Sequence, residues 1–313
     1  MDVNIHVRAL RSRMTALRPN YSLKSLLSVL QLLLELALVV FFIVYGLLHW
    51  SSISTAFVQL SPLWLLTCGL LYSAMHFFAV LATASLLRSL GCPRPYGMLF
   101  VIHIRRLPAK YLPGGIWHAV GRGADLVKDG IPIRRIGQLV GIEQLLAIWW
   151  SGFLGFVFAG LAFNGRIGRV ASMIAMCWLI ISLLALVWVR VRPGWRYLVE
   201  AVSAPEIVLA YVAGWICLAA GFTLYIWHGV DMLSSPLQVA ASYLVSWMIG
   251  AIAFFAPQGI GVFEISMARA LGQSGSLQAD IIWFIGSYRL LVLTADLAIW
   301  GGGCAWFRVI RVR

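Results

Sequence analysis

Long apolar runs are the feature that most constrains how this chain can fold. Stretches long enough to cross a bilayer as helices lie at roughly 26–48, 62–87, 138–162, 171–189, 207–228, 237–256 and 281–306. Hydrophobic residues make up 61% of the 313 residues and charged residues only 11%, and the mean hydropathy is +0.90. This composition excludes a water-soluble globule. We therefore expect an all-α polytopic membrane protein with about seven or eight transmembrane helices.

The distribution of basic residues predicts the orientation of these helices. The formal net charge is +13, and most of that charge lies between the apolar runs, where it sets orientation and attracts anionic headgroups. Residues 1–24 form a basic segment typical of the cytoplasmic membrane surface, and 88–135 is strongly basic, whereas 49–61 and 229–236 contain no Lys or Arg. The N-terminus is therefore expected to be cytoplasmic.

The C-terminal end requires one further crossing. Arg308, Arg311 and Arg313 favour the cytoplasmic side, but seven crossings from a cytoplasmic start would end outside. Residues 257–271 are too short for an ordinary span, and they could supply the crossing as a half-helix that dips into the membrane.

A basic segment broken by Pro and Gly, from Arg105 to Arg122, has the composition of an anion-binding site. Guanidinium groups beside the unpaired N–H groups of a helix start suit a lipid phosphate. The alternative is an ordinary cytoplasmic loop, since such loops are usually basic. The candidate binding residues in this segment are Arg105, Arg106, Lys110, Pro113, Gly114, Gly115, Trp117, His118 and Arg122.

A second broken segment, Pro-Gln-Gly-Ile-Gly-Val-Phe-Glu at 257–264, contains a carboxylate one turn into a new helix. That carboxylate, Glu264, could complement the helix N-terminus, or it could face a cation such as Arg269 or Arg289. Glu143, near the start of the 138–162 run, could pair with Arg122 or Arg135. This region adds Glu143, Pro257, Gly259, Gly261, Glu264, Arg269 and Arg289 to the candidate substrate-binding residues.

The two broken segments occupy corresponding places in the chain. Each puts a Pro two residues before a Gly, at Pro113/Gly115 and Pro257/Gly259. Interrupted segments at matching places predict an inverted repeat, with halves 25–162 and 171–313 inside one transmembrane domain, 25–313. Re-entrant segments must line a cavity, because unpaired backbone groups are not tolerated against lipid.

Several chemistries lack their usual residue patterns. The five cysteines show no CxxC spacing and the six histidines no paired metal-ligand spacing, so we expect no metal and no cofactor, and we interpret the histidines as packing or interfacial residues. Asp125 and Asp129 lie at i and i+4 and could hold Mg²⁺ on a diphosphate, but a solvated loop helix is the preferred interpretation. No ATP-binding loop is present, so any transport is passive or ion-coupled.

The motifs Lys-Tyr-Leu-Pro-Gly-Gly at 110–115, Pro-Gln-Gly-Ile-Gly-Val-Phe-Glu at 257–264 and Tyr-Arg at 288–289 resemble a known family. That family is the transmembrane region of the lysylphosphatidylglycerol synthases, the flippase-like domain of the multiple peptide resistance factor, which also occurs as stand-alone inner-membrane proteins. The resemblance covers essentially the whole chain. The soluble aminoacyl-transfer domain of the synthases is absent from these 313 residues, so synthesis of the aminoacyl lipid itself is not expected.

This resemblance implies a multi-pass protein of the cell (inner) membrane that moves a lipid between leaflets. An anionic phospholipid or a polyprenyl-phosphate-linked sugar suits the arginines best. The expected partners are therefore that lipid, the bilayer and an envelope-modifying enzyme, with no nucleic acid. Two other classes stay open: a membrane enzyme that uses Asp125, Asp129 and Glu264, and a non-catalytic subunit of a cell-envelope glycosylation or lipid-modification system.

Overall fold

The computed structural model describes residues 44, 47, 61–111, 117–191, 199–200, 202–227, 235–253, 259, 261–271 and 276–311. Every regular element in these ranges is a helix. In chain order they are α4 (Pro62–Ser89), α5 (Tyr96–Arg106), the 3₁₀ helix η1 (Leu107–Tyr111), α6 (Trp117–Lys128), α7 (Ile133–Ala162), α8 (Gly165–Arg190), α10 (Pro205–Trp227), α11 (Pro236–Ile252), α12 (Val262–Ala270) and α13 (Ser276–Arg311).

Five helices in the described part of the chain are long and apolar enough to cross a membrane: α4, α7, α8, α10 and the Phe284–Trp306 portion of α13. They coincide with five of the apolar runs, which supports a multi-pass membrane protein. The run at 237–256 becomes the shorter α11, and the run at 26–48 lies outside the described residues. The total of seven or eight spans, the re-entrant segments and the half-repeats stay predictions.

Proline and small polar residues determine where several helices begin. Proline fits the first turn of a helix, because it has no N–H to leave unpaired and its φ is already helical. Helix α4 starts at Pro62, α10 at Pro205 and α11 at Pro236. Ser61 caps α4, where its hydroxyl accepts a hydrogen bond from the Trp64 N–H at 3.4 Å.

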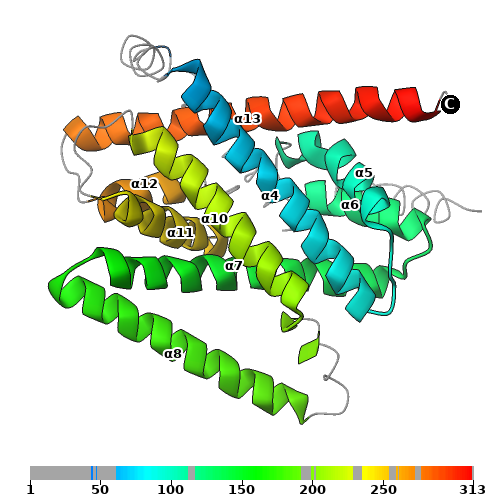
Figure 1. The fold of residues 1–313 in the computed structure, drawn as a ribbon, viewed down its shortest axis with the longest axis horizontal. Coiled ribbons are helices and arrows are strands. Elements are labelled where there is room, and N and C mark those ends of the chain that lie inside the picture. The colour runs from blue at the N-terminus through cyan, green and yellow to red at the C-terminus, as the bar shows by residue number, and fades with distance from the viewer. Residues whose placement is uncertain are drawn as a thin grey trace, which may run out of the picture.

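The helices cross at steep angles instead of forming a parallel bundle (Figure 1). Helices α4 and α10 run side by side through the middle, and the long α13 crosses them. Helix α7 packs against α11 on one side and α8 on the other, so α8 lies at the edge of the molecule. The main apolar core, which includes Phe222, Tyr225 and Leu244, lies where α4, α10, α11, α12 and α13 meet.

The basic region 88–135, which the sequence predicts as a cytoplasmic loop with a short helix, is largely helical. It folds as α5, η1 and α6, which pack on one another, and α5 and η1 also contact α13. A second apolar cluster, with Leu86, Leu99 and Leu126 in its centre, joins α4, α5 and α6. The cations of this region are therefore held on a fixed framework beside the membrane helices.

Helices α7 and α11 approach closely at a glycine. A Cβ placed on Gly155 would lie 2.8 Å from a methyl of Val245 and 3.0 Å from its backbone nitrogen. Small residues permit such contacts between membrane helices, and the close packing supplies dispersion energy that lipid cannot replace. Glycine is therefore required at position 155, because the two helices lie too close together there for a larger residue.

Replacement of Gly155 by alanine should lower the free energy of unfolding by about 1–3 kcal/mol, because the added methyl overlaps the α11 backbone. The measurement is the thermal unfolding midpoint of purified protein in detergent micelles. Gly141→Ala is the matched control, since Gly141 lies on the same helix and its Cβ would meet open space. The control should be neutral or slightly stabilising. Equal midpoints for the two variants would contradict the close contact.

Candidate functional site

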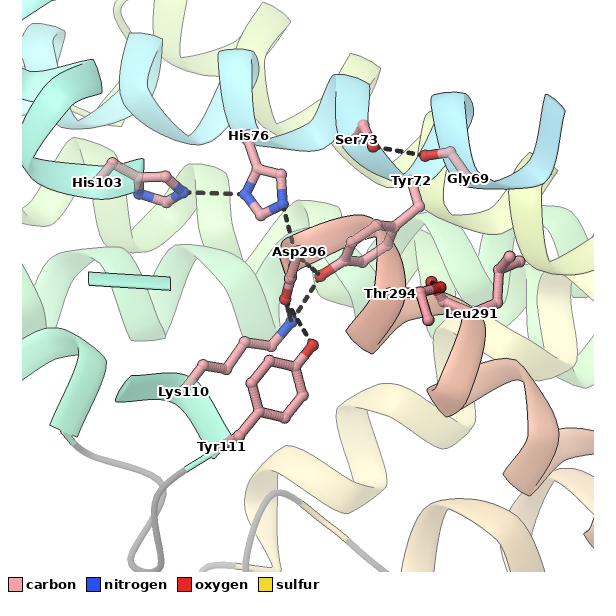
Figure 2. A network of polar contacts seen from close by, with 10 residues as sticks. All are labelled: Gly69, Tyr72, Ser73, His76, His103, Lys110, Tyr111, Leu291, Thr294 and Asp296. Carbon is pink, nitrogen blue, oxygen red and sulfur yellow. Dashed lines mark hydrogen bonds and ion pairs between the residues drawn. The ribbon is translucent and has the colours of Figure 1, made fainter. Parts of the chain in front are cut away.

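A buried carboxylate on α13, Asp296, is the centre of a polar cluster that joins several helices (Figure 2). The side chain is 1% exposed. Its Oδ1 accepts a hydrogen bond from the Tyr72 hydroxyl at 2.9 Å, and its Oδ2 accepts one from the Tyr111 hydroxyl at 2.6 Å. The Lys110 ammonium lies 3.2 Å from Oδ2 and 2.6 Å from the Tyr72 hydroxyl. Three separate elements, α4, η1 and α13, therefore converge on one carboxylate.

A chain of histidines extends from this carboxylate. His76 Nε2 lies 2.9 Å from Asp296 Oδ1, and His76 Nδ1 lies 3.0 Å from His103 Nε2. The His118 ring follows, edge-on to His103 with 5.0 Å between the ring centroids. Two buried ring nitrogens, His103 Nδ1 and His118 Nε2, have no hydrogen-bond partner among the described residues. We call Tyr72, His76, His103, Lys110, Tyr111 and Asp296 the Asp296 cluster.

Helical spacing explains why these side chains meet. Tyr72 and His76 lie at i and i+4, and Thr83 lies seven residues further on, so all three occupy one face of α4. On α13, Asp296 and Arg289 are seven residues apart and also share a face. The short η1 then presents Lys110 and Tyr111 to that pair of faces.

Electrostatics keeps the outer two histidines neutral. Helices α5 and α6, which carry them, are not among the candidate membrane spans. Burial, followed by the charges of Arg122 and Lys110, lowers the pKa of His118 to about 3. Burial, followed by Arg122, also holds the pKa of His103 well below its usual range. Burial and Asp296 raise the pKa of Tyr111, so its hydroxyl stays a donor to the carboxylate.

A second ion pair links α6 to α7. Arg122 donates to both carboxylate oxygens of Glu143, at 2.9 and 3.0 Å. The Thr83 hydroxyl donates to Glu143 Oε1 at 2.6 Å, and the Tyr211 hydroxyl donates to the Glu143 backbone carbonyl at 3.1 Å. Of the two partners considered for Glu143, Arg122 is confirmed, whereas Arg135 hydrogen-bonds Gln138.

The third ion pair lies in the second broken segment and combines both interpretations of Glu264. Its Oε2 accepts a hydrogen bond from the Gly261 N–H at 2.7 Å, which satisfies an open donor at the start of α12. Its Oε1 accepts from Arg289 Nε at 2.7 Å, and the Arg289 guanidinium lies 5.8 Å from the Phe263 ring centre. Glu264 is thus helix cap and counter-ion together, and Arg269 is exposed.

Gly259 and Gly261 both have a positive φ, a backbone conformation that favours glycine. Their φ values are +67° and +84°. A Cβ on Gly259 would lie 2.9 Å from the Cα of Gly250 on α11, so glycine is required there for conformation and for space. This contact brings the second broken segment against α11.

The remaining predicted residues lie at the margin of the site or outside it. Pro113, Gly114, Gly115 and Pro257 are outside the described residues, so the hollow expected between the broken segments stays a prediction. Arg105 and Trp117 are exposed. Arg106 donates two hydrogen bonds to Asp125, at 2.6 and 2.7 Å. These bonds hold the pKa of Asp125 below its usual range.

Asp125 on α6 and Asp129, which directly follows α6, do not form a shared metal site. Asp125 pairs with Arg106, and Asp129 pairs with Arg94, which draws the two carboxylates to different cations. Among the described residues no group of three His, Cys, Asp or Glu side chains could hold a metal ion. The interpretation as a solvated helix therefore fits better than the Mg²⁺ site, and Glu264 is buried in a different ion pair.

Sequence reasoning missed most of the Asp296 cluster. The histidines are interpreted from the sequence as packing or interfacial residues, and His76 and His103 are buried, at 2% and 5% exposed. That interpretation does not include their hydrogen bond to each other. A usable signal was present, since His76 and Asp296 are ionisable residues inside apolar runs, where such residues normally have a functional partner. Their separation of 220 positions concealed the pairing.

Fold and site together define a class: a helical multi-pass membrane protein with an interior array of ionisable side chains. Comparisons do not narrow this class to a family, because no family model, curated protein or solved structure matches the chain. The resemblance to the lysylphosphatidylglycerol synthase transmembrane region therefore stays an expectation from its motifs.

Arg289→Gln should destabilise the protein by about 3 kcal/mol, because it leaves Glu264, 1% exposed, as a buried charge without a cation. Glu264→Gln should cost less, since Arg289 is 33% exposed and can keep part of its hydration. Unfolding midpoints in micelles at neutral pH measure both.

The matched control is Arg88→Gln. Arg88 lies 3.8 Å from Glu206, and the two side chains are 68% and 49% exposed, so the loss should stay below about 1 kcal/mol. A reversed order of Arg289→Gln and Glu264→Gln would show that the arginine, not the carboxylate, is the costly partner to leave unpaired.

Proposed function

We propose that this protein is a membrane translocase that moves an anionic phospholipid or a polyprenyl-phosphate-linked sugar between leaflets. One observation carries the proposal. In two interior ion pairs the carboxylate is fully enclosed while the cation keeps a third of its surface accessible. Asp296 and Glu264 are each 1% exposed, whereas Lys110 is 31% and Arg289 33% exposed. A ligand that reaches these pairs meets positive charge, which favours an anionic headgroup.

The two cations lie around a common tyrosine. The Lys110 ammonium is 5.6 Å from the centre of the Tyr111 ring, and Arg289 is close enough to act electrostatically on the same phenol. Tyr111 is itself 37% exposed. The accessible part of the site therefore combines an ammonium, a guanidinium and an aromatic hydroxyl, a set that suits a phosphate with an attached polar group.

Ionisable groups continue from this point between α4, α5, α6 and α7. The Arg122–Glu143 pair lies beyond His118 and His103, both of which feel the Arg122 charge, and the histidines lead to Asp296. Ionisable side chains within membrane helices are costly, and they commonly mark the path of a substrate or an ion. An array that extends from α6 to α12 is more than helix packing requires.

The apolar exterior of the helices is where the acyl or isoprenoid chains of the lipid would lie. Helix α8 exposes Ile181, Leu184 and Val187, among others, and α7 exposes Leu145 and Leu161. Lipid chains are the natural solvent for these faces. In the proposed mechanism the headgroup passes along the polar array while its acyl or isoprenoid chains stay in the surrounding lipid. The charge selectivity comes from Lys110 and Arg289.

Lys110→Gln should slow translocation of phosphatidylglycerol about tenfold, since it removes one cation that stabilises the moving phosphate. The assay reconstitutes purified protein into vesicles with a fluorescent phosphatidylglycerol and follows its accessibility to a membrane-impermeant quencher. Gln removes the charge and is one atom shorter than Lys, but it keeps an N–H donor.

Arg94→Gln is the matched control, because Arg94 forms an ion pair with Asp129 away from the array, and it should translocate at the wild-type rate. Equal rates for Lys110→Gln and wild type would remove Lys110 from the path. If the wild-type chain moved neither phosphatidylglycerol nor a polyprenyl-phosphate sugar, yet co-purified with an envelope-modifying enzyme, a role as its non-catalytic subunit would replace the proposal.

A further inference from the structure

We propose that the Asp296 cluster takes up one proton when an anionic headgroup binds at Lys110, so that transport by this chain is coupled to protons. The inference rests on the proposed function, and it adds the identity of the coupling ion and the route by which that ion reaches the site. Three observations carry it: the charge balance of the interior, the direct contact between two histidines, and the unpartnered nitrogen at the end of that contact.

The described interior is electrically balanced before any ligand binds. Lys110 offsets Asp296, Arg289 offsets Glu264, and Arg122 offsets Glu143. A phosphate diester that enters this environment adds one negative charge, and an unbalanced charge is costly at membrane depth. One proton on Asp296 restores the balance and lets Lys110 turn from the carboxylate to the phosphate. Anion and proton therefore stabilise each other at this site.

The hydrogen bonds assign tautomers to the two inner histidines. With both rings neutral, His76 Nε2–H donates to Asp296 Oδ1, and His103 Nε2–H donates to His76 Nδ1. In this assignment His103 Nδ1 carries no proton and has a free lone pair. The same nitrogen has no hydrogen-bond partner among the described residues. His103 is 5% exposed, so its lone pair is a buried acceptor aimed away from Asp296. It is a vacant proton-binding position at the end of the relay.

Proton transfer through the relay is balanced in atoms. A proton binds at His103 Nδ1, the Nε2 proton of His103 passes to His76 Nδ1, and the Nε2 proton of His76 passes to Asp296 Oδ1. The carboxylate becomes a carboxylic acid, both imidazoles end neutral in the opposite tautomer, and no other group changes. His118 lies beside His103 and follows the exposed Trp117 on α6, which places the entry at that helix.

Other charged and titratable groups surround the relay. Asp296 faces α4 and η1, and His103 faces α4, α6 and η1. The groups are Tyr72 and His76 on α4, Lys110 and Tyr111 on η1, His118 and Arg122 on α6, and Tyr288 and Arg289 on α13. The nearby cations oppose a resting proton on the histidines. Only a ligand that draws Lys110 away, or brings negative charge near, favours uptake.

The test is calorimetric titration of purified protein in detergent with short-chain phosphatidylglycerol, in two buffers of different ionisation enthalpy. The dependence of the heat on the buffer gives the number of protons taken up, which should be about one for the wild type. The phosphodiester does not itself titrate near neutral pH. Affinity should therefore fall about tenfold per unit rise in pH, because one bound proton is linked to one bound anion.

Two variants distinguish the role of Asp296 as the proton acceptor from the role of His103 in the relay. Asp296→Asn should bind the lipid with no proton uptake and no dependence on pH, since Lys110 then supplies the balancing charge. His103→Gln should keep the proton number near one but take up that proton about tenfold more slowly in a stopped-flow measurement with a pH dye, because the relay sets only the rate. A purely structural His103 would change stability and leave the uptake rate of the folded protein unaltered.

The outcomes are distinguishable. Wild-type binding with no proton uptake at any pH between about 5.5 and 8 would overturn the inference and leave the proposed function standing. Uptake that persists in Asp296→Asn would overturn the assignment to this carboxylate. If Asp296→Asn does not fold, the pH dependence of wild-type affinity and the His103→Gln rate decide the question. No binding of the lipid by the wild type would overturn both the proposed function and the inference.

Discussion

The need to pair every buried charge is the constraint on which the interior of this protein depends. Each carboxylate removed from water costs several kcal/mol unless a cation and hydrogen-bond donors surround it. Asp296 meets this cost with Tyr72, His76, Lys110 and Tyr111, and Glu264 does so with Arg289 and the Gly261 N–H. Because the partners come from different helices, these requirements fix how α4, α12, α13 and η1 lie against one another.

Helix α4 contacts both the polar array and the apolar core. One face carries Tyr72, His76 and Thr83, which reach the Asp296 cluster and the Arg122–Glu143 pair. The adjoining faces carry the apolar residues that pack on α10, where Cys68 and Gly221 come close. Helix α4 therefore joins the polar array to the apolar core. A change in the ionisation of the array can alter how α4 packs in the core. Such a shared element is what coupling between sites requires physically.

The sequence allowed prediction of the membrane helices and of two ion pairs, but not of the Asp296 cluster. The pairs Glu264–Arg289 and Glu143–Arg122 could be foreseen, because each carboxylate lies within one or two elements of a cation. The Asp296–His76 contact joins positions 220 residues apart, and nothing in a single sequence specifies which faces of two apolar helices meet. The sequence indicates cationic partners for Glu143 and Glu264, but it does not indicate Asp296, the carboxylate that pairs with Lys110.

The neutrality of the ion pairs constrains the transport step that we propose. A site lined by unpaired arginines would bind a phosphate so tightly, and would be so costly to empty, that release would limit turnover. In the proposed mechanism, a headgroup competes with Asp296 and Glu264 for cations that already have partners, so its binding is an exchange of counter-ions. The exchange returns the carboxylates to their cations when the ligand leaves, which favours release. Each accessible cation is already paired with an enclosed carboxylate. The proposed headgroup contacts are therefore individually strong, but the net affinity is weak.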